Sequence, residues 1–394
     1  MAEEVSTAPE SASAASFTLG SLLQYFLWLG TFGFGGPIAL VGYMQRDLVE
    51  RRTWFSKQDY TEGLALSQLA PGPLAAQLAI YLGWLKGGTR GATLVAAAFI
   101  LPSFLMVLFL SALYLAYGGL SWMQGAFYGI GAAVIAIIGR SAWKLMRSTI
   151  KSDRVAWGIF AVSALVTAWT ESEIVWLFLA SGLAMLAARG FLAGRASAAL
   201  FVPWPWLLGG LHGAASPDTL VRIAWYFAEA GAFVFGSGLA IVPFLHGGVV
   251  NEFGWLTERQ FLDAVAVAMI TPGPVVITVA FIGYLVAGPL GAVVAAIGVF
   301  LPCYLFVVIP ARYFRRSIGS PGVKAFVDGV TAAATGAIAG AGFVLGRRAI
   351  VDLTTVLIAA GTLACLVWAR RVPEPLVIIG AGVLGLGLST SGVP

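Results

Sequence analysis

The sequence predicts an all-α polytopic membrane protein made of two homologous halves. The composition is one reason, because 59% of the 394 residues are hydrophobic and only 10% are charged, whereas soluble proteins carry about 25% charged residues. A second reason is that apolar runs long enough to cross a bilayer, such as 92–116 and 353–369, recur along the chain. The third reason is an internal repeat.

The repeat is clearest at a Pro-Gly-Pro motif that interrupts a hydrophobic segment. Residues 70–73, Ala-Pro-Gly-Pro, return at 271–274 as Thr-Pro-Gly-Pro, and the same offset of 201 pairs Trp54 with Trp255. Further matched positions are Phe34-Gly35 with Phe235-Gly236, Glu62 with Asp263 and, after one residue is dropped, Leu101-Pro102 with Leu301-Pro302. A duplicated apolar unit with a broken hydrophobic segment in each copy is typical of secondary transporters.

Each half contains six hydrophobic segments. We expect a disordered tail at 1–17, a first transporter repeat at 18–195, a linker at 196–220 and a second repeat at 221–394. The tail is rich in Ser, Ala and Glu and has no positively charged start, so it does not resemble a signal peptide. The segments are 18–45, 60–84, 91–117, 122–143, 155–170 and 174–194 in the first half, and 221–247, 261–286, 290–311, 323–346, 350–369 and 375–391 in the second.

The distribution of Lys and Arg favours a topology in which not every segment crosses the membrane. If all twelve segments cross, the 23 basic residues divide 11 to 12 between the two sides. If the two Pro-Gly-Pro segments enter the membrane and return on the same side, 20 basic residues lie inside, and those outside are Arg259, Arg347 and Arg348. Because cytoplasmic loops are enriched in Lys and Arg, we favour the second topology.

This topology gives each half about five crossing helices and one re-entrant Pro-Gly-Pro hairpin. An odd number of crossings inserts the second half upside down relative to the first. We therefore expect an inverted repeat, with hairpin tips that approach the midplane from opposite sides of the membrane. Both termini are then expected outside.

The Pro-Gly-Pro motifs predict helix breaks that can bind an anion. Proline has no N–H and clashes with the preceding helical turn, but it is favoured at the first position of a helix. A helix that starts at Pro73 or Pro274 therefore directs free N–H groups, and the positive end of its dipole, toward the break. The alternative is that these residues serve only kinks and close packing, as Pro and Gly often do in membrane helices.

A glycine-rich break precedes each Pro-Gly-Pro motif. Glycine allows backbone N–H groups to approach a ligand closely, and a serine hydroxyl in the second-half break can donate to an anion. The candidate substrate-binding residues of the first half are Gly33, Gly35, Gly36, Pro37, Gln68, Pro71, Gly72, Pro73 and Gln77. Those of the second half are Gly236, Ser237, Gly238, Thr271, Pro272, Gly273, Pro274 and Thr278.

Four carboxylates are candidates for proton coupling. Glu62 and Asp263 occupy matched positions before the two Pro-Gly-Pro motifs, and Glu229 and Asp328 lie deeper in the second half. An intramembrane carboxylate can carry a proton because burial favours its neutral form. For Glu62 and Asp263 there is a second interpretation, as helix-start carboxylates near the membrane interface.

Other chemistries have little support in the sequence. It contains no His-Glu-x-x-His motif and no Gly-x-x-x-x-Gly-Lys loop, so we expect no metal, no cofactor and no ATP-driven pump, and the net charge of +5 needs no nucleic-acid partner. A remote alternative is an intramembrane serine hydrolase that uses Ser237 with His246, although no acid is placed to orient His246. Cys303 and Cys365 are expected to be small core residues, not a disulfide.

In their order and spacing, these motifs resemble the chromate ion transporter family in its long two-domain form. They are Phe32-Gly33-Phe34-Gly35-Gly36-Pro37, Trp54 and Leu69–Pro73 in the first half, and Phe235-Gly236-Ser237-Gly238, Pro243, Trp255 and Thr271–Pro274 in the second. The resemblance extends from about residue 18 to the end. It implies chromate efflux driven by an ion gradient, with sulfate as a similar tetrahedral dianion. The second half departs from the pattern at Ser237 and Gly238, which leaves open whether both halves contribute equally to one site.

We therefore expect a secondary transporter of the bacterial inner membrane that exports chromate by alternating access and confers chromate resistance. The oxyanion would bind near the midplane, between the two Pro-Gly-Pro tips and the two glycine-rich breaks. The alternative is a carrier or channel for sulfate or another oxyanion, because charge and shape barely distinguish sulfate from chromate. A homodimer is a further expectation.

Overall fold

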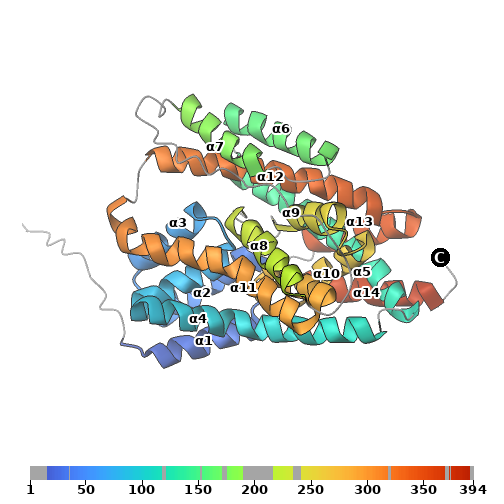
Figure 1. The fold of residues 1–394 in the computed structure, drawn as a ribbon, viewed down its shortest axis with the longest axis horizontal. Coiled ribbons are helices and arrows are strands. Elements are labelled where there is room, and N and C mark those ends of the chain that lie inside the picture. The colour runs from blue at the N-terminus through green and yellow to red at the C-terminus, as the bar shows by residue number, and fades with distance from the viewer. Residues whose placement is uncertain are drawn as a thin grey trace, which may run out of the picture.

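The computed structural model describes residues 16–34, 36–117, 121–150, 153–170, 175–189, 216–233, 241–317, 321–368, 372 and 374–390, and these ranges are almost entirely helical (Figure 1). The first-half helices are α1 (Leu19–Phe32), α2 (Gly36–Met44), α3 (Lys57–Leu69), α4 (Leu74–Tyr117), α5 (Ser121–Thr149), α6 (Arg154–Thr170) and α7 (Val175–Ala188). The second-half helices are α8 (Pro217–Phe233), α9 (Ile241–His246), α10 (Glu258–Ile270), α11 (Thr278–Ser317), α12 (Pro321–Ala349), α13 (Leu353–Trp368) and α14 (Glu374–Thr390).

The helix boundaries follow local sequence signals that recur in both halves. α3 begins after Ser56, whose Oγ accepts a hydrogen bond from the Asp59 N–H, and α10 begins after Thr257, which forms a capping box with Gln260. α3 ends at Leu69 and is capped by Ala70, just before the first Pro-Gly-Pro motif, and α10 ends in the same way at Ile270, capped by Thr271. The predicted breaks at these motifs are therefore present among the described residues.

A short π-helix and a tight turn precede α3, and the same features precede α10. The π-helices are η1 (Gln45–Arg51) and η4 (Gly247–Glu252). Trp54 N–H donates to Leu48 O and Trp255 N–H donates to Val249 O, both at 2.8 Å. The residue before each tryptophan has a left-handed backbone conformation in both halves. The two halves therefore share individual hydrogen bonds and backbone angles as well as helix order.

Helices α4 and α11 each reverse direction near their start. Gly87 and Gly88 leave the helical conformation in α4. In an uninterrupted helix, residues eight apart are about 12 Å apart, yet a Cβ on Gly91 would lie 2.1 Å from Gly83 O. The segment 74–86 therefore packs back against the rest of α4, and the matched break at Ala287 and Gly288 gives α11 the same shape.

The two halves are interlocked through their last helices. α6 and α7, from the first half, pack on α12 of the second, whereas α13 and α14 of the second half pack on α5 of the first (Figure 1). Glycines allow the close approach: a Cβ on Gly129 of α5 would lie 2.0 Å from Ala381 O of α14, and one on Gly329 of α12 would lie 2.4 Å from Ser181 O of α7. α4 and α11, one from each half, also pack on each other.

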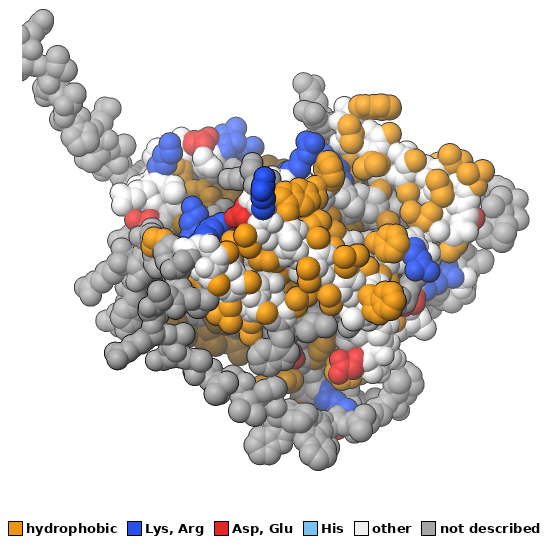
Figure 2. All heavy atoms as spheres, turned by 90° about the horizontal axis from the view of Figure 1, so that it is seen from above, with side chains coloured by type: hydrophobic (Ala, Val, Ile, Leu, Met, Phe, Trp, Pro, Cys, Tyr) orange, Lys and Arg blue, Asp and Glu red, His pale blue; other side chains and the backbone are white. Residues whose placement is uncertain are grey.

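The outer surface is largely apolar, as a lipid-facing surface requires. Figure 2 shows hydrophobic side chains over the viewed face, with Lys and Arg gathered toward its edges. Trp169, Trp225 and Leu165 are among the large apolar side chains that are more than two-thirds exposed. By length and composition, four described helices can cross a membrane, at Leu74–Tyr117, Trp122–Lys144, Val275–Ala311 and Lys324–Arg347, and further apolar helices are shorter. The protein is an all-helical, duplicated membrane protein.

Candidate functional site

The two Pro-Gly-Pro turns lie at the contact between α4 and α11. Gly72 and Gly273 adopt positive φ angles of 135° and 95°, which only glycine adopts readily. α4 begins at Leu74, one residue after the predicted start at Pro73. The second turn differs, because a 3₁₀ turn, η5 (Val275–Ile277), intervenes between Pro274 and the start of α11.

The second turn is held by residues of the first half. Ser103, in α4, is fully buried, and its Oγ–H donates to Pro272 O at 2.7 Å. Gly273 N–H donates to Gly33 O at 3.0 Å. A Cβ on Gly273 would lie 2.0 Å from Ser103 Oγ, so this turn requires glycine for its packing as well as for its φ angle.

The first turn is contacted by the matched residue of the second half, but with different chemistry. A Cβ on Gly72 would lie 2.9 Å from Cys303 Sγ, while the Cys303 S–H donates within its own half, to Val299 O at 3.0 Å. Gln77 is fully buried, and its Nε2 donates to Pro71 O at 2.5 Å. The two turns are thus matched in position and unequal in their hydrogen bonds.

The remaining candidate binding residues divide into four groups. Gly33 caps α1, and Gly36 and Pro37 open α2, so the first glycine-rich break separates two helices as predicted. Thr271 and Thr278 are buried beside the second turn, but each hydroxyl donates to a carbonyl of its own segment. Gln68 is exposed on α3 and is not brought to the turns. Gly35, Gly236, Ser237 and Gly238 lie outside the described residues.

The matched carboxylates Glu62 and Asp263 lie in different surroundings. Asp263 is 5% exposed and accepts a hydrogen bond from the Tyr114 hydroxyl at 2.7 Å, which joins α10 to the end of α4. Glu62 is half-buried on α3, and Gln58 Nε2 donates to its Oε1 at 3.0 Å. The hydrogen bond of Asp263 therefore joins the two halves, whereas the bond from Gln58 to Glu62 lies within α3.

The other two candidate carboxylates lie away from the turns. Glu229 is half-buried in the last part of α8. Asp328 accepts a hydrogen bond from Arg189 at 2.7 Å, and Arg189 also donates to Asp153 at 3.0 Å, so Asp328 belongs to an ion-pair network near the start of α12. Among the described residues, no hydrogen bond joins either carboxylate to a Pro-Gly-Pro turn.

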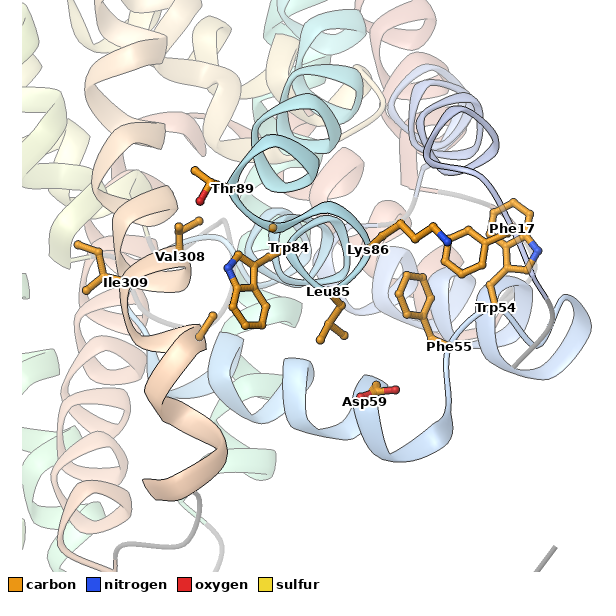
Figure 3. A pocket seen from close by; sticks show the side chains of 12 residues that line it. Phe17, Trp54, Phe55, Asp59, Trp84, Leu85, Lys86, Thr89, Val308 and Ile309 are labelled. Atoms are coloured by element: carbon orange, nitrogen blue, oxygen red, sulfur yellow. The ribbon is translucent and has the colours of Figure 1, made fainter. Parts of the chain in front are cut away.

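Two cavities lie at the bases of the two Pro-Gly-Pro segments. The first, of about 800 Å³, lies between the start of α3, the end of segment 74–86 and the end of α11 (Figure 3). Its lining includes Trp54, Asp59, Trp84, Lys86 and Ile309. Lys86 extends toward the ring of Phe17, with its Nζ 4.0 Å from the ring centroid.

The second cavity is smaller, about 210 Å³, and lies between α10, α5 and the end of α4. Tyr114, Gln124, Arg259 and Asp263 are part of its lining. Arg259 Nη2 donates to Gln124 O at 3.2 Å. Because the start of α10 lines this cavity and the start of α3 lines the other, the two cavities occupy positions related by the repeat.

Sequence analysis missed three residues that the structure brings to these sites. Ser103 and Cys303 directly follow the matched Leu-Pro pairs, and this alignment was a signal that could have identified them. Tyr114 had no such signal, because its contact with Asp263 joins segments 149 positions apart. The statement that no acid orients His246 was wrong, since Glu258 Oε2 lies 2.8 Å from His246 Nε2.

Comparison with known proteins gives a consistent result. The chain matches the family described as Chromate transporter over residues 20–186 and 221–386. It is 56% identical over 378 residues to a chromate transport protein of Cupriavidus metallidurans, covering 95% of this chain and 94% of that one. It is 55% identical to a probable chromate transport protein of Synechococcus elongatus (94% and 96% covered), and 31% identical to a chromate transport protein of Pseudomonas aeruginosa (98% of each). No solved structure matches the chain.

Proposed function

Because this chain belongs to the chromate transporter family, we propose that it exports chromate from the cytoplasm by alternating access, and so confers chromate resistance. Membership makes it a multi-pass membrane transport protein. The observation that carries the proposal is that each Pro-Gly-Pro turn packs against a helix of the other half, the first beside Cys303 of α11 and the second beside Ser103 of α4. There, buried backbone groups at helix starts can replace part of the hydration of an oxyanion.

The proposed topology is an inverted repeat with two re-entrant hairpins. Its support is that the paired helices α4 and α11 run antiparallel: Thr93, near the start of the crossing part of α4, hydrogen-bonds Tyr304, late in α11, at 2.8 Å. The start of α3 and the end of segment 74–86 also line one cavity, as expected for a segment that returns to the side it entered. The positive-inside count places that cavity on the cytoplasmic side of a bacterial inner membrane.

Alternating access then corresponds to the exchange of one open cavity for the other. The cytoplasmic cavity of about 800 Å³ is the larger one, and the opposite cavity of about 210 Å³ is lined in part by Tyr114 and Asp263, which are hydrogen-bonded to each other. This arrangement corresponds to a state that is open toward the cytoplasm. The substrate would reach the turns from the wide cavity and leave through the narrow one.

Proton coupling is a further part of the proposal. Among Glu62, Glu229, Asp263 and Asp328, we favour Asp263, because it is buried, lines a cavity and joins the halves. Its replacement by Asn should abolish the pH dependence of transport and leave chromate binding largely intact. If the amide variants of all four carboxylates keep the wild-type pH dependence, the coupling assignment is wrong.

The decisive experiment measures chromate flux in inside-out membrane vesicles from cells that express the protein, with sulfate as competitor. Uptake that requires an energised membrane supports export, and strong inhibition by sulfate indicates a shared oxyanion site. Flux no greater than in empty-vector vesicles would overturn the chromate assignment. Sulfate flux without chromate flux would favour the alternative oxyanion carrier.

A further inference from the structure

The two Pro-Gly-Pro turns differ in how many of their polar groups are already hydrogen-bonded. In the second turn, Ser103 donates to Pro272 O and Gly33 O accepts from Gly273 N–H. The nearby Thr278 hydroxyl donates to Val275 O at 2.8 Å. The second turn is therefore fastened to the first half by its own polar groups.

The first turn retains unused hydrogen-bonding groups. The first N–H groups of α4 have no intrahelical acceptor, and among the described residues no acceptor meets those of Gly72, Leu74 or Ala75. Gln77 adds an acceptor. The carbonyl of Pro71 can only accept a hydrogen bond, so the amide atom next to it must be Nε2 and the other must be Oε1. Gln77 Oε1 is buried and receives no hydrogen bond from any described residue.

The Gln77 amide lies directly over the turn. A Cβ on Gly72 would lie 2.5 Å from Gln77 Nε2 and 2.9 Å from its Cδ. The turn thus offers several N–H donors, which suit an anion, next to one acceptor, which requires a hydrogen on the ligand. A fully ionised tetrahedral oxyanion satisfies the donors and leaves the acceptor unmatched, whereas an oxyanion that carries one proton satisfies both.

We propose that the first Pro-Gly-Pro turn is the oxyanion-binding half of the site, that the second turn is its fixed support, and that Gln77 Oε1 selects an oxyanion that carries a proton. The inference rests on the proposed function and deepens it. Chromate takes up one proton near neutral pH, whereas sulfate does so only in strong acid. Gln77 then prefers hydrogen chromate over sulfate, although the two parent dianions are alike in shape and charge.

Within the part of the chain that the structure describes, few titratable groups approach this turn. Cys303, from α11, faces Gly72, and its S–H is donated to Val299 O. Tyr81 lies one turn further along α4, against Gly63 of α3, and Glu62 precedes that glycine. The pH dependence of binding should therefore persist in Cys303→Ser and Glu62→Gln, because it belongs to the ligand.

The test measures ligand binding to the purified full-length protein in detergent by calorimetry, without a membrane gradient. The affinity for total chromate should fall about tenfold for each pH unit above neutral, because only the protonated fraction binds. Phosphate, which also carries a proton in this range, should compete more strongly than sulfate at equal concentration. Gln77→Met, which removes the acceptor at similar volume, should weaken chromate binding about tenfold at pH 6.

The matched control is Ser111→Ala, which alters a buried serine of the same helix whose Oγ–H donates to Val107 O; it should bind as the wild type does. Binding that is independent of pH, sulfate that competes as well as phosphate, or unchanged binding in Gln77→Met would each overturn the inference. An equal loss in Thr278→Val would overturn the assignment to the first turn. Chromate binding without chromate flux in wild-type vesicles would instead overturn the proposed function and leave this inference standing.

Discussion

The turn before α3 and the matched turn before α10 each contain a tryptophan, and a different type of side chain lies over it in each half. In the first half, the Arg52 guanidinium lies 4.7 Å from the ring centroid of Trp54. In the second half, the ring of Phe253 stacks on Trp255 at 4.5 Å. At the matched position, Arg52 acts on Trp54 by cation–π attraction and Phe253 acts on Trp255 by aromatic stacking, while Trp54 also stacks on Phe17.

A second pair of matched locations also differs by the presence of an arginine. Arg189 bridges Asp153 and Asp328 in one network. At the corresponding location, related by the repeat, the Tyr128 hydroxyl donates directly to Asp352. The positive charge is present in one copy and absent from the other, while the helices around it keep their places. We infer that glycine, proline and apolar residues specify the shared fold, whereas the basic residues distinguish the two sides of the membrane.

The largest expected effect tests the shared geometry. A Cβ on Gly30 of α1 would lie 2.3 Å from Phe99 O, and one on Gly231 of α8 would lie 2.1 Å from Val299 O. We expect Gly30→Ala and Gly231→Ala each to destabilise the fold by about 3 kcal/mol, because the methyl group forces two helices apart. Thermal unfolding of the detergent-purified protein measures this loss, and Gly139→Ala, whose added Cβ meets no atom within 4 Å, is the control. Wild-type stability in either variant would contradict the equivalence of the two contacts.

The next effect separates the two turns. Ser103→Ala leaves the buried Pro272 carbonyl without its donor and should cost about 2 kcal/mol. Cys303→Ala should cost less in hydrogen bonding, because its S–H bonds only within its own half. Unfolding midpoints in denaturant, compared between the two variants, measure the difference. Equal losses would mean that the turns are held alike.

A smaller effect concerns the left-handed residue before each tryptophan. Thr53 has a φ angle of 49°, and its counterpart Gly254 has 57°. A β-branched residue is strained in this conformation, so Thr53→Gly should stabilise the protein by about 1 kcal/mol. The reverse change, Gly254→Thr, should destabilise it. Unfolding temperatures of the two variants give the comparison, and shifts of the same sign would refute it.

The smallest effect depends on pH. The hydrogen bond from Arg189 holds the pKa of Asp153 below its ordinary value, and the bond from Tyr128 lowers that of Asp352. Each lowered pKa contributes stability that is present above the ordinary pKa of about 4 and is lost as the pH falls through the lowered value. Arg189→Gln should therefore make the acid loss of stability shallower, as Tyr128→Phe should. A thermal-shift series from pH 6 to pH 3 measures the slope, and an unchanged slope in both variants would contradict this origin.

Much of the fold could be predicted because its signals are local. Proline and glycine break helices wherever they occur in apolar segments, so the breaks between α1 and α2 and between α3 and α4 were visible in the sequence. Two features were not. The contact of Ser103 with Pro272 joins residues 169 positions apart, and the packing of α6 and α7 on α12 depends on shape and not on any motif.

The candidate site could be predicted in outline and not in detail. Both turns lie where the repeat suggested, but Gln68 is exposed while its neighbours Leu66 and Ser67 are buried. A helix rotates by about 100° per residue, so nearness in sequence to a motif does not decide which side a residue faces. Asp263 and Glu62 are aligned in sequence, but Asp263 is buried against Tyr114, which lies 149 positions away, whereas Glu62 is half-buried.

The exchange of end helices between the halves has a consequence for biosynthesis. When the ribosome has completed α6 and α7, the helix on which they pack, α12, has not yet been made. α1 and α3 can already pack on α4 within the first repeat, but α5, α6 and α7 lack most of their partners until the second repeat is inserted. If the two halves were translated as separate chains, each would likewise need the other before its last helices could pack.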